Sequence, residues 1–288
     1  MQKRKRPYLP YLILVICIIL TLPLWSVWLI IHPDNLRHGS STPEDIAAPY
    51  EVVQLPVSDG TVLSGWYVPA SKKTDRAVIL IHGYTHDKST MLTVAEALHP
   101  DFNLLLVDLR FHGDSKGLYS TFGIRERIDM QYAVTFLEER GMSEVGILGY
   151  SLGAATALMT AGSDPRIDAV VAYAPFASIT LLADEAYEWL GIARAPFIGM
   201  MEFWARMFFG ANPRTVSPVA LSRNITAPVL HIHSQSDDFI PFGNATMIRD
   251  ALTSSANVEV WYPARGAHVE IPFRFNDRVK DFFIRTLY

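Results

Sequence analysis

The sequence Gly-Tyr-Ser-Leu-Gly at residues 149–153 constrains the fold of this chain more than any other stretch. An apolar run at residues 144–148 precedes it, and an alanine-rich helical pattern at residues 154–159 follows. This order predicts a buried strand, a sharp turn and a helix, with Ser151 exposed at the turn. The turn strains the serine backbone, so Gly149 and Gly153 provide the room it needs. A glycine–serine turn without chemistry is the alternative interpretation.

The first 31 residues predict a membrane anchor. Residues 3–6, Lys-Arg-Lys-Arg, precede an uncharged run from Tyr8 to Ile31 that is long enough to cross a bilayer. Trp25 and Trp28 suit the interfacial aromatic belt, and Pro23 is tolerated in a membrane helix. The basic cluster predicts a single pass through the cell membrane with everything after about residue 32 on the extracytoplasmic side. A cleaved signal peptide or a buried core helix is the alternative.

Charge and cysteine content exclude several classes of function. The basic cluster takes four of the 25 Lys and Arg residues, which leaves 21 against 29 Asp and Glu, a net charge of −8. Nucleic-acid binding requires basic clusters, so no nucleic-acid partner is expected. The one cysteine, Cys17, lies in the apolar run, which excludes disulfides and thiol catalysis. The sequence has no Cys/His cluster with zinc spacing, and we expect neither a metal nor an organic cofactor.

The sequence predicts three parts of the chain: an anchor at 1–32, a polar linker at 33–49 and a domain at 50–288. Within the domain, strand and helix patterns alternate. Strand patterns occur at residues 52–57, 61–68, 77–81, 103–107, 144–148, 168–174, 228–233 and 258–261. Helical patterns occur near residues 89–98, 124–140, 152–163, 242–252 and after 272. Continuous apolar strands are typical of a mostly parallel sheet with helices on both faces, an α/β fold. Residues 176–210 interrupt the alternation with an apolar, aromatic, helical insertion.

Reactive side chains follow several predicted strands, and the carboxyl ends of parallel strands meet at one edge. Ser151 needs a base, and His268 lies in a loop after the strand ending at Trp261. Asp237 and Asp238 follow the strand at 228–233, and a histidine base needs a carboxylate. The chain order Ser, Asp, His matches that of a known catalytic triad. An oxyanion would bind the backbone N–H groups of Leu152 and Tyr84.

These residues give the chain a resemblance to the α/β-hydrolase superfamily over roughly residues 50–288, and it is similar to membrane-anchored bacterial serine hydrolases of the esterase or serine aminopeptidase-like type. The motifs are His82-Gly83-Tyr84, Asp108-x-Arg-x-His-Gly-x-Ser115, residues 149–153, His233-x-x-x-Asp237-x-x-x-Pro241 and Gly266-Ala267-His268. The sequence departs from the family pattern at two positions, where Phe111 and Ser234 stand in place of glycine.

The resemblance implies a catalytic triad of Ser151, Asp237 and His268. In the family pattern the acid lies four residues before the loop proline, here Pro241, which favours Asp237 over Asp238. Asp108 is the less favoured acid, because Arg110 beside it predicts an ion pair that braces the loop. His82 is expected to brace the oxyanion loop. His231 and His233 are expected to be core histidines.

The predicted activity is hydrolysis of a small-molecule carboxylic ester or acyl substrate through an acyl-enzyme. A peptidase or amidase with the same triad, and a catalytically inactive surface-binding homologue, are the alternatives. The insertion is predicted to be a cap over Ser151 that supplies an apolar acyl pocket, although it could also only pack onto the sheet. Its expected apolar residues are Ile179, Leu182, Ala186, Leu190, Met200, Met201 and Met207. The oligomeric state is left open.

Overall fold

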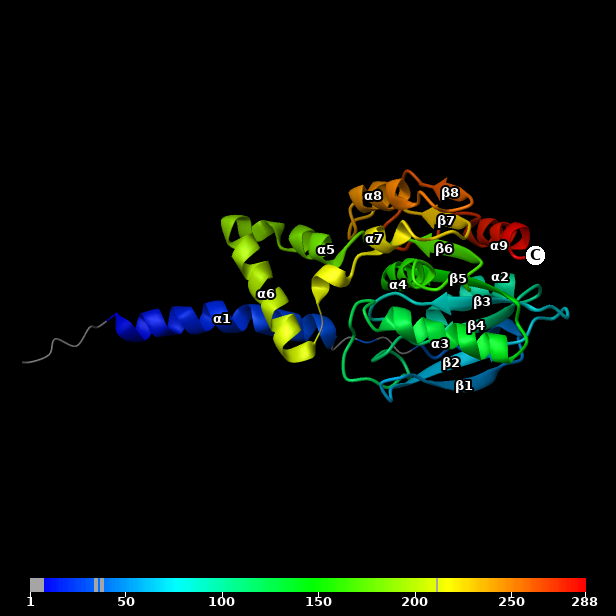
Figure 1. Ribbon diagram of the computed structural model, residues 1–288, viewed down its shortest axis with the longest axis horizontal. Coiled ribbons are helices and arrows are strands. Elements are labelled where there is room, and N and C mark those ends of the chain that lie inside the picture. The colour runs from blue at the N-terminus through cyan, green and yellow to red at the C-terminus, as the bar shows by residue number, and fades with distance from the viewer. Residues whose placement is uncertain (1–7, 34–35, 37–38, 211) are drawn as a thin grey trace, which may run out of the picture.

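Eight strands form one sheet in the part of the chain that the computed structural model describes, residues 8–33, 36, 39–210 and 212–288 (Figure 1). They are β1 (Glu51–Pro56), β2 (Val62–Val68), β3 (Arg76–Ile81), β4 (Asn103–Val107), β5 (Glu144–Tyr150), β6 (Ala169–Tyr173), β7 (Val229–Ile232) and β8 (Val258–Trp261). Their order is β1-β2-β4-β3-β5-β6-β7-β8. The pairs from β4 to β8 are parallel, and the pairs β1–β2 and β2–β4 are antiparallel. The predicted mostly parallel sheet is confirmed.

Two apolar layers cover the sheet. One layer holds α3 (Glu126–Glu139), α4 (Leu152–Ala161), α7 (Pro218–Ser222) and α8 (Gly243–Ala251), and the other holds α2 (Leu92–Leu98) and α9 (Phe275–Thr286). Successive strand residues alternate between the layers, so Ile79 packs in the first and Leu80 in the second. Both are fully buried, which explains why the central strands are continuous apolar runs. The described residues also form the short 3-10 helices η1 (Pro43–Ile46), η2 (Lys88–Met91), η3 (Glu188–Ala193) and η4 (Pro213–Thr215).

The turn from β5 into α4 brings the backbones of two elements into close contact. A Cβ atom on Gly149 would lie 2.2 Å from the carbonyl carbon of Gly153. A Cβ atom on Gly153 would lie 2.4 Å from the carbonyl oxygen of Ile81 and 2.5 Å from that of His82. Both glycines are therefore required by close approach. The N-terminus of α4 therefore lies directly against the end of β3 and the start of the loop that follows it.

The insertion between β6 and β7 forms a helical cap of α5 (Ile179–Ala186), η3 and α6 (Arg194–Phe209). It projects from the sheet on the same side as the N-terminal helix α1 (Leu9–Ile31), and α6 crosses α1 (Figure 1). Trp204 donates its indole N–H to the carbonyl oxygen of Leu20 at 2.9 Å. Val27 of α1 packs with Met201 and Ala205 of α6. The cap therefore contacts both the sheet domain and the second half of α1.

Helix α1 has the length and composition of a membrane span. The apolar stretch within Pro10–Ile31 has a mean hydropathy of 2.6, and only 11% of its residues are buried. Helix α1 is therefore not a core helix of the sheet domain. A membrane anchor and a signal sequence share these properties. The basic cluster at residues 3–6 lies outside the described residues.

The segment predicted as a linker contacts the sheet domain. Gly39 donates its backbone N–H to Asp87 Oδ2 at 2.6 Å, and Ala48 is 3% exposed among the apolar side chains around α2. Ser120 donates its backbone N–H to the carbonyl oxygen of Ile31 at 3.0 Å. The end of α1 and the described part of residues 33–49 therefore lie against the sheet domain instead of holding it away. The boundaries at 32/33 and 49/50 stay predictions.

We expect Gly153→Ala to destabilise the protein by about 1–3 kcal/mol, because the added methyl group is forced against two carbonyl oxygens. The control is Gly199→Ala in α6, where a Cβ atom would meet no atom within 4 Å. That change should stabilise the helix by about 0.5–1 kcal/mol. Thermal unfolding of the full chain in detergent measures both, at about 2–4 °C per kcal/mol. Equal shifts of the two variants would contradict the close-packing argument.

Candidate active site

Ser151 stands at a strained turn at the carboxyl edge of the sheet. Its φ and ψ are 52° and −113°, its backbone N–H donates to the carbonyl oxygen of Tyr173 at 2.8 Å, and it is 8% exposed. Such conformations cost about 1–3 kcal/mol and persist only where the surroundings impose them. Here the close packing of Gly149 and Gly153 imposes it. The serine is the N-cap of α4, so its hydroxyl lies beside the free N–H groups of that helix.

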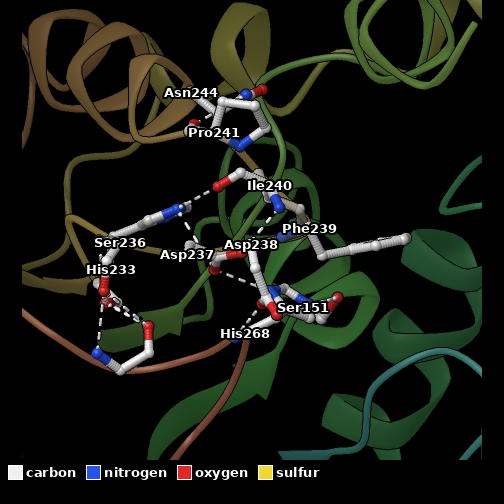
Figure 2. A network of polar contacts seen from close by, with 12 residues as sticks. Ser151, His233, Ser236, Asp237, Asp238, Phe239, Ile240, Pro241, Asn244 and His268 are labelled. Carbon is white, nitrogen blue, oxygen red and sulfur yellow. Dashed lines mark hydrogen bonds and ion pairs between the residues drawn. The ribbon is translucent and has the colours of Figure 1, made fainter.

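His268 joins Ser151 to Asp237 (Figure 2). Its Nε2 lies 2.8 Å from Ser151 Oγ, and its Nδ1 lies 2.8 Å from Asp237 Oδ2. In the tautomer with its proton on Nδ1, the ring donates to the carboxylate and accepts the hydroxyl proton of the serine. The structure therefore brings the three predicted residues into one hydrogen-bonded chain.

The carboxylate of Asp237 is held ionised. Its side chain is fully buried, and burial alone would raise its pKa. Hydrogen bonds from His268 and from the backbone N–H groups of Ile240 and Phe239, at 2.7 and 2.9 Å, outweigh burial and hold the pKa below its usual value. Asp237 therefore carries the negative charge that would stabilise a protonated imidazole.

Asp238 has a role that sequence reasoning missed. Its Oδ1 accepts the backbone N–H of His268 at 2.9 Å. The neighbouring carboxylates thus bind the same histidine, Asp237 at the ring and Asp238 at the backbone. The adjacent pair of acidic residues was visible in the sequence. The contact of Asp238 with the backbone of His268 was not, because it depends on how the loop after β8 folds.

The loop after β3 lies against the serine. A Cβ atom on Gly83 would lie 3.5 Å from Ser151 Cβ. His82 is buried, accepts the backbone N–H of Leu109 at Nε2 (3.0 Å) and donates from Nδ1 to the carbonyl oxygen of Gly83 (2.7 Å). Burial, with neighbouring His112, holds its pKa well below the usual value, so it stays neutral. The same peptide plane carries the N–H of Tyr84, so His82 braces this loop, as predicted.

The ion pair predicted between Asp108 and Arg110 was wrong. Asp108 binds Lys88 through its Oδ2 at 2.5 Å, and Arg110 binds Asp129 at 2.6 Å. Each side chain pairs with a residue from a different element, Lys88 of η2 for Asp108 and Asp129 of α3 for Arg110. Asp108 still braces a loop, because it also accepts the backbone N–H of Asp114 at 2.9 Å.

His231 and His233 are buried on β7 and the loop that follows it. Tyr262 Oη lies 3.2 Å from His231 Nδ1, and His233 Nε2 lies 3.0 Å from the carbonyl oxygen of Ile240. Burial, with His233 beside it, lowers the pKa of His231 to about 3. His233 therefore contacts the loop that carries Asp237, through Ile240, and His231 is a neutral core residue.

Ser151 opens into a cavity of about 760 Å³ beneath the cap, within the range of about 300–1,000 Å³ for ligand pockets. Most of its lining is apolar. The lining includes Tyr84, Phe122, Ser151, Leu152, Phe176, Ile179, Leu182, Ala186, Met201, Ala205, Val216, Phe239 and Ile240. Of the cap residues expected there, Ile179, Leu182, Ala186 and Met201 line the cavity, whereas Leu190, Met200 and Met207 do not. Three side chains of α1 also line it: Val27, Ile30 and Ile31.

Comparison with known proteins agrees with this architecture. A family model described as the alpha/beta hydrolase fold matches residues 76–219, half of the chain. The uncharacterized protein YqkD of Bacillus subtilis (strain 168) is 30% identical over 221 residues, 72% of either chain. The chain belongs to the α/β-hydrolase fold family.

Other relatives of this hydrolase carry names that describe an activity. The thiohydrolase apmlB of Arthrinium phaeospermum is 33% identical over 132 residues, 43% of either chain. The esterase Pf2001 of Pyrococcus furiosus has a TM-score of 0.74 and 24% identity, covering 90% of this chain and 99% of that one. The structural likeness shows the fold, and together these comparisons identify an enzyme, a hydrolase.

We expect Asp237→Asn to lower kcat by on the order of 10³–10⁴-fold, because an amide at that position favours the wrong tautomer of His268. The matched control is Asp238→Asn, whose side-chain oxygen still accepts the backbone N–H of His268, so kcat should stay within about threefold. Steady-state hydrolysis of p-nitrophenyl butyrate measures both. A larger loss in the Asp238 variant would show that the two carboxylates are assigned in the wrong order.

Proposed function

We propose that this hydrolase cleaves carboxylic esters through an acyl-enzyme intermediate, with Ser151 as nucleophile, His268 as base and Asp237 as the carboxylate partner. The observation that carries the proposal is the hydrogen-bonded chain of these three side chains, with 2.8 Å at each step, at the floor of an apolar cavity. A serine hydroxyl is a poor nucleophile alone, and a histidine in this position activates it.

In the acylation step His268 Nε2 takes the proton of Ser151 Oγ as the oxygen attacks the ester carbonyl carbon. The carbonyl oxygen becomes an oxyanion, which we assign to the backbone N–H groups of Leu152 and Tyr84. Leu152 is the first residue of α4, and its N–H has no partner within the helix. Tyr84 follows the glycine that His82 holds in place.

Collapse of the tetrahedral intermediate breaks the bond between the carbonyl carbon and the alkoxy oxygen. The leaving alcohol takes the proton from His268, and the acyl group stays on Ser151. His268 then removes a proton from water as the water oxygen attacks the acyl carbon. The bond between that carbon and Ser151 Oγ breaks, Ser151 regains the proton from His268, and the carboxylic acid leaves. Asp237 stays ionised throughout and stabilises the imidazolium of each step, consistent with its lowered pKa.

The apolar lining favours an ester with an apolar acyl group. Each buried methylene contributes about 0.8 kcal/mol of binding free energy, so a cavity that holds an acyl chain binds longer chains more tightly. The esterase and thiohydrolase names among the relatives support acyl transfer to water, and the same triad accepts an oxygen or a sulfur leaving group.

Amide hydrolysis is the second candidate because a carboxylate lies in the cavity. Glu185 lines it, accepts Asn244 Nδ2 at 3.1 and 3.2 Å, and has a pKa raised by burial. In its ionised form this carboxylate would bind the ammonium group of a peptide N-terminus, as a serine aminopeptidase requires.

A panel of p-nitrophenyl esters from acetate to palmitate, beside aminoacyl-p-nitroanilides, tests the choice on the full chain in detergent. We expect kcat/KM to rise several-fold per added methylene until the cavity is full, because about 0.8 kcal/mol per methylene corresponds to about fourfold. Ser151→Ala should abolish both hydrolysis and labelling by a fluorophosphonate probe. Faster hydrolysis of anilides would favour the peptidase, and unchanged labelling of Ser151→Ala would remove the nucleophile assignment.

We also propose that α1 anchors the hydrolase in the cell membrane with residues 33–288 outside. Residues 3–6 are basic, and α1 is long and apolar enough to span a bilayer. Protease added to intact cells should remove a C-terminal tag, and the mass of the mature protein should include residues 1–31. Survival of the tag until lysis would contradict the orientation, and loss of residues 1–31 would identify a signal peptide.

A further inference from the structure

The last turn of α1 is part of the active-site cavity. Val27, Ile30 and Ile31 line the same space as Ser151. Tyr84 donates its hydroxyl to the carbonyl oxygen of Ile30 at 2.5 Å. The backbone N–H of Ser120 donates to the carbonyl oxygen of Ile31 at 3.0 Å. Carbonyl groups in the last turn of a helix have no partner within it, so the hydrolase domain satisfies them here.

One of the two residues that depart from the family pattern, Phe111, lies at this junction. It has a φ of 67°, a conformation that is unfavourable for a bulky side chain and that glycine adopts readily. Its ring packs edge-on against His32, with centroids 5.5 Å apart, and His32 stacks on Trp28 at 3.8 Å. The phenylalanine thus places an aromatic ring against the end of α1 where glycine would place none.

The cap lies beside the second half of α1, the half that follows Leu20. The bond from Trp204 to Leu20 joins the second half of α6 to the middle of α1. If Trp25 and Trp28 mark the membrane interface, Ile30 and Ile31 lie at the level of the lipid headgroups. The cap also exposes large apolar side chains: Trp189, Ile192, Phe203, Met207 and Phe208. An apolar surface of this kind beside a membrane helix fits immersion in the outer leaflet.

The charged residues that line the cavity are acidic. Glu185, Glu202 and Asp238 are among its lining residues, and no Lys, Arg or His among the described residues lines it. Glu202 is paired with Arg214 at 2.9 Å, whereas Glu185 and Asp238 form no ion pair within the part of the chain that the structure describes. An anionic headgroup would be repelled by these carboxylates, whereas an uncharged alcohol would not.

We propose that the substrate is an uncharged long-chain acyl ester resident in the same bilayer as α1. Its acyl chain lies in the cavity against the last turn of the anchor, and its carbonyl reaches Ser151 at the membrane interface. The products are the long-chain carboxylic acid, which gains the oxygen of water, and the free alcohol. This inference rests on the proposed serine hydrolase activity and names its substrate class.

Two matched variants of the full chain test the role of the anchor. Ile30→Phe enlarges a side chain in the cavity, and Leu29→Phe makes the same change in volume at a neighbouring residue that is 43% exposed and outside the cavity. In detergent, Ile30→Phe should lower kcat/KM for p-nitrophenyl palmitate at least tenfold more than for the butyrate. Leu29→Phe should change neither by more than twofold.

Reconstitution tests the membrane-resident substrate. The full chain is placed in phosphatidylcholine vesicles that contain either dioleoylglycerol or the anionic dioleoylphosphatidylglycerol, and released oleate is measured by mass spectrometry. We expect at least tenfold faster release from dioleoylglycerol than from the anionic ester. Release should also be at least tenfold faster when enzyme and dioleoylglycerol share a vesicle than when they are in separate vesicles.

The outcomes separate the inference from the proposed function. If the wild type hydrolyses butyrate, equal effects of Ile30→Phe and Leu29→Phe overturn the inference and leave the serine hydrolase in place. Equal rates from shared and separate vesicles, or preference for the anionic ester, overturn it as well. A wild type that neither hydrolyses butyrate nor reacts with a fluorophosphonate removes the proposed function, and the substrate class with it.

Discussion

The contact on which the site depends is the approach of Gly153 to the carbonyl oxygens of Ile81 and His82. It sets the distance between the N-terminus of α4 and the end of β3. The first carries Ser151 and the N–H of Leu152, and the second begins the loop that His82 braces. The proposed nucleophile and its two candidate oxyanion donors come from segments about 70 positions apart, and the β3–β5 ladder together with this backbone contact holds their relative positions.

The other half of the site is built from two neighbouring parallel strands. Asp237 follows β7 and His268 follows β8, and the ladder between these strands sets their loops side by side. Asp237 holds the ring of His268 and Asp238 holds its backbone, so the histidine is fixed at both ends. His233 lies under the same loop, hydrogen-bonded to Ile240. Rigid strands thus position the proposed base, His268, although it lies in a loop.

The sequence predicted the features that depend on local pattern. The turn at Ser151, the order of the strands along the chain, and Asp237 as the carboxylate at the histidine ring all follow from short motifs. The ion pair of Asp108 did not, because its partner Lys88 lies 20 positions away and Arg110 offered a nearer cation. The docking of α1 was also missed: Tyr84 and Ile30 meet across 54 positions, and an apolar run looks the same whether lipid or protein covers it.

The junction at the end of α1 has a practical consequence for anyone who prepares the enzyme. A soluble fragment beginning at residue 33 removes Val27, Ile30 and Ile31 from the cavity wall and leaves the hydroxyl of Tyr84 without its acceptor. Its pocket would open to water on the side where a helix now stands. Rates measured on such a fragment would describe a differently shaped site, so α1 belongs in every kinetic preparation as a component of the enzyme.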